Sequence, residues 1–105
     1  MTVDEYAQWA AGISKPGTSR HERLTYLALA LIGEAGEACD NIKNLIRDGT
    51  FDEDHVAYEL GDLIYYWTCL CVELGKAPSD VLAKSRANIE QRIAKRVAGI
   101  APRSS

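Results

Sequence analysis

The sequence lacks the paired cysteines of disulfide-rich proteins, the long apolar runs of membrane proteins and the excess of basic residues of nucleic-acid-binding proteins. Its three cysteines, Cys39, Cys69 and Cys71, are an odd number without the spacing of a metal site or a redox motif, and we expect small buried thiols. No apolar run is long enough to cross a bilayer, and no signal peptide follows Met1. A net charge of −3 argues against a basic surface for nucleic-acid polymers. These absences predict a cytoplasmic protein that binds neither membranes nor nucleic-acid polymers.

Strand-type alternation and internal repeats are also missing. Apolar residues instead recur at steps of three and four, the period of one helix face. With 47% hydrophobic and 26% charged residues in 105, the composition is that of a globular chain. We therefore predict one all-α domain over residues 1–98, resembling a four-helix bundle, with a flexible tail over residues 99–105.

Start and stop signals divide the chain into four predicted helices. Thr2 and Glu5 form a capping-box pattern, so the first helix should run from there to about residue 12. The second should run from residues 19–22 to about residue 47. Asp52 or Asp54 should cap the third, and Ser79 should cap the fourth.

The predicted helices carry more apolar surface than one small bundle can bury. Both flanks of the third helix are apolar, and Trp9, Phe51 and Trp67 add large rings. A chain of this length buries only a modest fraction of its surface alone. We therefore expect a homodimer, or a dimer of dimers, to complete the core, with Trp9 and Trp67 in the core or the interface.

Two pairs of acids stand on neighbouring predicted helices. Glu34 and Glu37 are one turn apart, and so are Glu59 and Asp62. If the two helices pack antiparallel about Gly49, Glu37 and Asp62 fall at similar heights. Four like charges raise one another's pKa unless a cation neutralises them. A cluster of oxygens without His or Cys favours Mg²⁺ or Mn²⁺.

A pair of glutamates one turn apart on a helix is usually only a solvated face. The glycines beside these acids argue for more than that. Gly33, Gly36 and Gly61 stand inside predicted helices, where each costs about 1 kcal/mol relative to alanine. We expect close backbone approach beside the acids as the compensation.

The double motif Gly33-Glu-Ala-Gly-Glu37 with Glu59-Leu-Gly-Asp62 resembles the MazG-like nucleoside triphosphate pyrophosphohydrolases, an all-α superfamily. The similarity of the helix pattern extends over roughly residues 4 to 96. The resemblance implies Mg²⁺ ligation by Glu34, Glu37, Glu59 and Asp62. It also implies cleavage between the α and β phosphates to a nucleoside monophosphate and pyrophosphate, with Glu34 or Glu37 taking a proton from the attacking water.

The resemblance also implies contacts to the substrate. Asn88 and Arg92 match a closing segment that approaches the phosphates. Tyr66 stands where relatives of the dCTP pyrophosphatase type carry an aromatic that stacks on the base, although Asn44 replaces a tryptophan of that subgroup. Lys84 and Lys43 could add positive charge for phosphoryl transfer, or remain ordinary exposed lysines.

Two other classes of function remain open from the sequence. One is a carboxylate-bridged di-iron protein, but such sites use Glu-x-x-His, and neither His21 nor His55 follows a glutamate by three residues. The other is a non-enzymatic helical dimerisation module whose acids are only solvated. We expect His55 to lie on the surface, whereas His21 could face the base from the preceding loop, and neither is a predicted catalytic residue.

Overall fold

The computed structural model describes residues 1–14 and 17–99, and its regular structure there is helical throughout. The predicted all-α class is therefore confirmed. Most of the predicted tail, from residue 100 onward, lies outside the described residues. The helices are α1 (Val3–Ile13), α2 (Arg20–Ile42), α3 (Asn44–Asp48), α4 (Glu53–Glu73) and α5 (Pro78–Val97).

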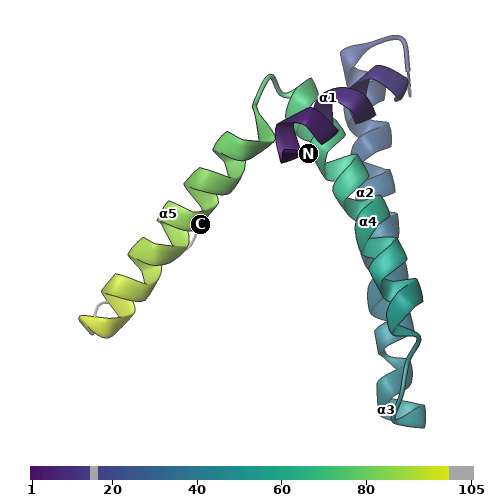
Figure 1. The fold of residues 1–105 in the computed structure, drawn as a ribbon, viewed down its shortest axis with the longest axis vertical. Helices are drawn as coiled ribbons and strands as arrows, with labels where there is room; N and C mark the ends of the chain where they lie inside the picture. Colours follow the sequence, from purple (N-terminus) through teal and green to yellow (C-terminus); the bar gives the residue numbers. More distant parts are fainter. Residues whose placement is uncertain (15–16, 100–105) are drawn as a thin grey trace.

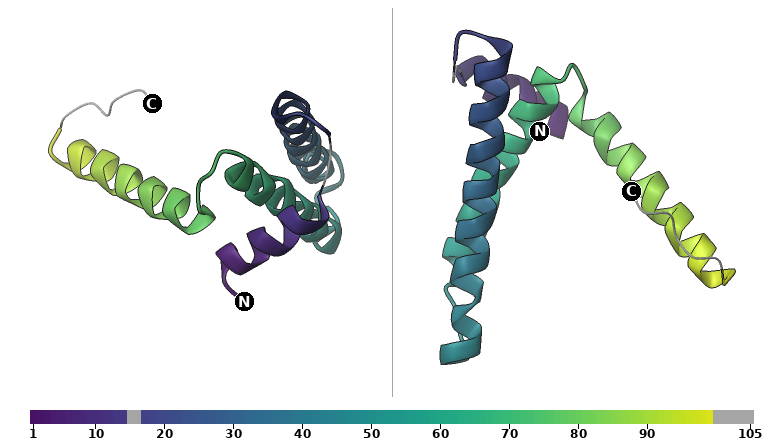
Figure 2. Two further views of the ribbon diagram at one scale, coloured as in Figure 1. Left: turned by 90° about the horizontal axis from the view of Figure 1, so that it is seen from above. Right: turned by 180° about the vertical axis from the view of Figure 1, so that it is seen from behind.

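The centre of the fold is an antiparallel hairpin of α2 and α4, which lie side by side along their lengths (Figures 1 and 2). Leu27 of α2 and Cys69 of α4 are buried where the two helices meet. At the same end, Nε of Arg23 lies 3.0 Å from both carboxylate oxygens of Glu73. This contact joins the first turn of α2 to the last turn of α4.

α1 crosses the end of the hairpin at which α4 finishes (Figure 1). Ala7 and Ala10 are fully buried, because small side chains let the helix approach α4 closely. Trp9 packs edge-on against Tyr65 with ring centroids 6.4 Å apart, although the tryptophan stays 57% exposed. Within one chain, Trp9 is therefore not a buried core residue, and only one side of its ring packs against the protein. Its predicted place in an interface between chains stays a prediction.

α5 leaves the hairpin and points away from it (Figures 1 and 2). The prediction that Ser79 caps this helix is wrong. Ala77 is the N-cap and Pro78 occupies the first turn, where its missing N–H costs no hydrogen bond. Ser79 instead donates its backbone N–H and its hydroxyl to the carboxylate of Asp4.

Other helix ends follow the sequence signals more closely. The Thr2–Glu5 capping box is present, and Asp52 accepts the backbone N–H of His55 as the N-cap of α4. The second helix, however, stops at Ile42 instead of continuing to about residue 47. The chain turns at Lys43, and α3 then ends at Gly49, whose φ of +74° favours glycine.

Large apolar side chains remain on the outside of a single chain. Leu29 is 71% exposed, Ile32 70% and Ile46 91%. Hydrophobic surface of this extent is typical of a protein-protein interface. In the described part of the chain, none of the helices has both the length and the hydropathy needed to cross a membrane.

Two expectations about small residues are wrong within one chain. Cys39 is exposed, because it follows buried Ala38 and is turned about 100° away from α4. Cys69 and Cys71 are buried as predicted. Close backbone approach at Gly33, Gly36 and Gly61 is absent, since a Cβ added at each would meet nothing within 4 Å.

Candidate metal centre

Three of the four predicted acids meet between α2 and α4. Glu34 and Glu37 extend from α2 and Glu59 from α4, and one carboxylate oxygen of each lies within 4.8 Å of the others. Glu59 is 3% exposed, Glu34 is half-buried and Glu37 is exposed. The cluster therefore has a buried base and a side open to solvent.

Asp62 stands beside this group and is not part of it. Burial is the main cause of the raised pKa of Glu34 and of Glu59, and the charge of Asp62 adds to both shifts. The prediction that Glu37 is level with Asp62 is wrong, because Glu37 instead lies opposite Glu59. The reason is the break at Lys43 and the turn before α4, which shift the register from that of two continuous helices.

The electrostatics of the cluster favour a cation. Burial raises the pKa of Glu34, and the charges of Glu37, Asp62 and Glu59 raise it further. Burial also raises the pKa of Glu59, while His55 opposes that shift. Among the described residues, Oε2 of Glu59 is buried without a hydrogen-bond partner. An orphaned carboxylate oxygen within a set of carboxylates fits a hard divalent cation such as Mg²⁺ or Mn²⁺.

The predicted surface position of His55 is confirmed, since its side chain is 55% exposed, but its contact with an acid of the cluster was not predicted. Its Nε2 lies 3.0 Å from Oε1 of the buried Glu59. The spacing of four residues on one helix was a signal in the sequence, but burial of the glutamate could be known only from the packing of α2 on α4.

A concavity next to the cluster opens toward α3. It is walled by polar side chains from α2, α3 and α4, and Oδ1 of Asn41 is buried there without a partner in the described residues. Lys43 stands nearby with its ammonium 2.7 Å from a carboxylate oxygen of Asp40, and both side chains are exposed. The lining residues are Glu37, Asp40, Asn41, Asn44, His55 and Glu59.

Tyr66 lies at the other end of the acids. Its ring is half-buried and meets the ring of Tyr26 edge-on, with centroids 6.5 Å apart. Burial raises the pKa of Tyr66, followed by Tyr26 and by the charges of Glu34 and Asp62. The predicted base-stacking residue is therefore close to the acids and has a second aromatic ring beside it.

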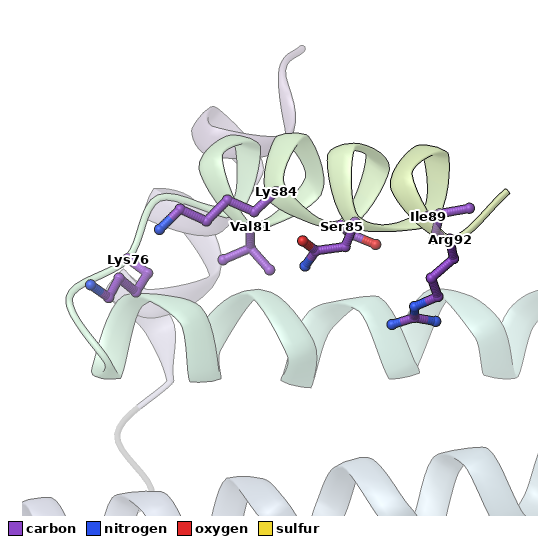
Figure 3. A pocket seen from close by; sticks show the side chains of 7 residues that line it. Lys76, Val81, Lys84, Ser85, Ile89 and Arg92 are labelled. Atoms are coloured by element: carbon purple, nitrogen blue, oxygen red, sulfur yellow. The ribbon is translucent and has the colours of Figure 1, made fainter. Parts of the chain in front are cut away.

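The predicted phosphate contacts on α5 form a separate group. Lys84, Asn88 and Arg92 line one groove along α5, together with Lys76 from the preceding loop (Figure 3). This groove shares no residue with the concavity beside the acids. Within one chain, Lys84, Asn88 and Arg92 thus lie apart from the predicted metal ligands, whereas Lys43 lies near them.

The model of the MazG nucleotide pyrophosphohydrolase domain matches residues 22–97. This chain belongs to the MazG family. The match includes both acid pairs and all of α5, and it confirms the resemblance noted in the sequence.

The chain is also similar to a protein of a bacteriophage. The chain is 32% identical over 76 residues to the "Gene 37 protein" of Mycobacterium phage L5, covering 68% of this chain and 67% of the phage protein. None of the solved protein structures matches the chain significantly. Family membership supports a nucleotide pyrophosphohydrolase activity in general terms.

Proposed function

We propose that this protein hydrolyses nucleoside triphosphates between the α and β phosphates, in a reaction that depends on Mg²⁺ or Mn²⁺. The products would be a nucleoside monophosphate and pyrophosphate. The observation that supports this most directly is the set of carboxylates from Glu34, Glu37 and Glu59, which converge within 4.8 Å in a MazG domain. A cytoplasmic nucleotide pool would supply the substrate.

In this proposal, Glu34, Glu37 and Glu59 hold the cation, and Asp62 completes the set from its place beside Glu34. The donor atoms are all carboxylate oxygens, which suits hard cations and disfavours zinc. When bound, the cation would supply positive charge for the triphosphate and for the charge that develops during hydrolysis.

The proton of the attacking water needs an acceptor, and Glu34 and Glu37 are the candidates. Glu34 is half-buried, and burial together with the neighbouring acids raises its pKa. A bound cation would keep Glu34 ionised, and an ionised carboxylate beside the attacking water can accept its proton. The open side of the cluster at Glu37 gives water and substrate a way in.

The rest of the substrate would contact residues outside the cluster. Tyr66 would stack on the base, since its ring lies beside the acids and next to Tyr26. Lys84, Asn88 and Arg92 would bind phosphate oxygens, because they line one groove with donors along it (Figure 3). Lys43 would join them from the edge of the acidic concavity after leaving Asp40.

A homodimer, or a dimer of dimers, belongs to the same proposal. Leu29 and Ile32 are exposed on the hairpin, and the space beside Gly33, Gly36 and Gly61 is open. A second copy covering this surface would bury apolar area and give the glycines the close neighbours that one chain lacks.

The two other classes of function have less support. A di-iron protein needs imidazole ligands, but the carboxylate group contains no histidine within the described residues, and His55 contacts Glu59 from outside it. A non-enzymatic dimerisation module gives no reason for a buried, unpartnered oxygen on Glu59.

The proposal is tested by incubating the protein with a panel of deoxy, ribo and modified nucleoside triphosphates plus Mg²⁺ and assaying pyrophosphate. Glu37→Gln and Asp62→Asn should each lose turnover while retaining the helical circular dichroism of the wild type. Glu53→Gln, an exposed acid in the first turn of α4, serves as the matched control and should remain active. Full activity in both site variants would refute the proposed site.

A further inference from the structure

Glu59 is a buried carboxylate whose two oxygens have different surroundings. Oε1 lies 3.0 Å from Nε2 of His55, one turn earlier on α4. Oε2 is buried, and no hydrogen-bond partner for it occurs within residues 1–14 and 17–99. A buried acceptor without a donor costs folding free energy. Oε2 is therefore the oxygen that Glu59 has available for a cation.

His55 is itself fixed from two sides. Its backbone N–H donates to Oδ1 of Asp52, the N-cap of α4, at 3.0 Å. Its ring stacks on Tyr58 with an interplanar angle of 10° and centroids 6.2 Å apart. The first contact fixes the backbone of His55 and the second orients its ring, although more than half of the side chain is exposed.

An ordinary surface ion pair explains these contacts less well. Such pairs join two mobile side chains in water and contribute little. Here the glutamate side chain is only 5% exposed, so the imidazole meets an oxygen that the fold already holds in place. His55 is also absent from the set of mutually close ligand atoms, so it acts on Glu59 and does not replace it.

We propose that His55 is a positioning residue for the metal centre. Its Nε2–H holds Oε1 of Glu59 and so directs Oε2 toward the cation shared with Glu34 and Glu37. This inference rests on the proposed function, because it requires the cation. Hydrogen-bond partners of metal ligands fix ligand orientation, and their loss typically weakens metal binding about 10–100-fold.

The test is titration calorimetry with MnCl₂ and no nucleotide, on wild type, His55→Ala and His55→Gln. His55→Ala should raise the Kd for Mn²⁺ by about 10–100-fold. His55→Gln should recover most of the affinity, because its side-chain amide keeps a donor for Oε1. His21→Ala removes an exposed histidine on α2 and should leave the Kd unchanged. Circular dichroism and Tm verify the fold of each variant.

The outcomes separate this inference from the proposed function. If Glu59→Gln loses Mn²⁺ binding while His55→Ala keeps wild-type affinity, the positioning role is wrong and the metal centre stands. Equal weakening in His55→Ala and His55→Gln would also overturn it, since the donor would then be irrelevant. If the wild type binds no Mn²⁺, the proposed metal-dependent function fails, and the positioning role fails with it.

Discussion

The carboxylate of Asp4 accepts two hydrogen bonds from Ser79, one from its backbone N–H and one from its hydroxyl. The two residues are 75 positions apart, so the contact ties α1 to the first turn of α5. Backbone N–H groups in the first turn of a helix have no partner within it, and a carboxylate there supplies one. Asp4 thus serves as the cap that the sequence assigned to Ser79.

Replacing Asp4 by Asn should lower the Tm by several degrees. The hydroxyl of Ser79 and then its backbone N–H lower the pKa of Asp4, so the fold favours the charged carboxylate. Scanning calorimetry at neutral pH measures the effect. Asp54→Asn is the control, because Asp54 is also an exposed acid in the first turn of a helix. An unchanged Tm in Asp4→Asn would show that the contact does not stabilise the fold.

The Arg23–Glu73 contact should make part of the stability depend on pH. The hydrogen bond from Arg23 lowers the pKa of Glu73 below its ordinary value of 4.5. A depressed folded pKa gives stability that is present above the ordinary value and is lost as the pH falls through the folded pKa.

Glu73→Gln should therefore have a lower Tm than wild type at pH 7, and the difference should shrink as the pH is lowered into the acid range. Glu90→Gln is the control, since Glu90 pairs with Arg86 on an exposed face. Its difference from wild type should be small at every pH. A difference for Glu73→Gln that persists in acid would show that the charge of Glu73 is not its cause.

Mg²⁺ should stabilise the chain, and more so at neutral than at acid pH. The raised pKa values of Glu34 and Glu59 mean that their charged forms oppose folding without metal. The contribution of these two carboxyl groups to folding stability is greatest in acid, and it is lost as the pH rises through their raised pKa values. A bound cation favours the charged carboxylates and so stabilises the folded state at neutral pH. At a free Mg²⁺ concentration of about 100 times Kd, the folded state gains about 2.7 kcal/mol.

Thermal unfolding with and without Mg²⁺ measures this shift in Tm. Glu59→Gln should abolish it, and Glu53→Gln should retain it. A wild-type Tm that does not respond to Mg²⁺ would favour the non-enzymatic dimerisation module over a metal enzyme.

Ile32→Arg should reduce the association of chains. Ile32 is 70% exposed on α2, and a charge there would have to lose its water in an apolar interface. Sedimentation velocity compares it with wild type and with Gln91→Arg, which adds the same charge at an exposed polar position on α5. A wild-type chain that sediments as a monomer at all concentrations would contradict the proposed dimer.

The parts of the structure that were predictable from sequence are those set by local chemistry. The capping box at Thr2 and the cap at Asp52 need only neighbouring residues, and both are present. Periodicity also placed Glu34 and Glu37 on one side of a helix. Each of these depends on residues within a turn or two of one another.

The parts that were not predictable depend on packing between distant residues. The break at Lys43 changes the register of the hairpin, so Glu37 meets Glu59. Ser79 has the composition of a cap, but Asp4 from another helix takes that role. His55 meets a buried carboxylate because α2 packs on α4 and covers Glu59.

The way α5 is attached has a geometrical consequence. The helix points away from the rest of the molecule (Figure 1). Its first turn contains Ser79, which meets Asp4 of α1. Its 20 residues form a helix about 30 Å long, so a tilt of about 10° at its N-terminus would move its C-terminus by about 5 Å. A small change in the orientation of α1 at this contact would therefore displace the C-terminal half of α5 much further than its first turn.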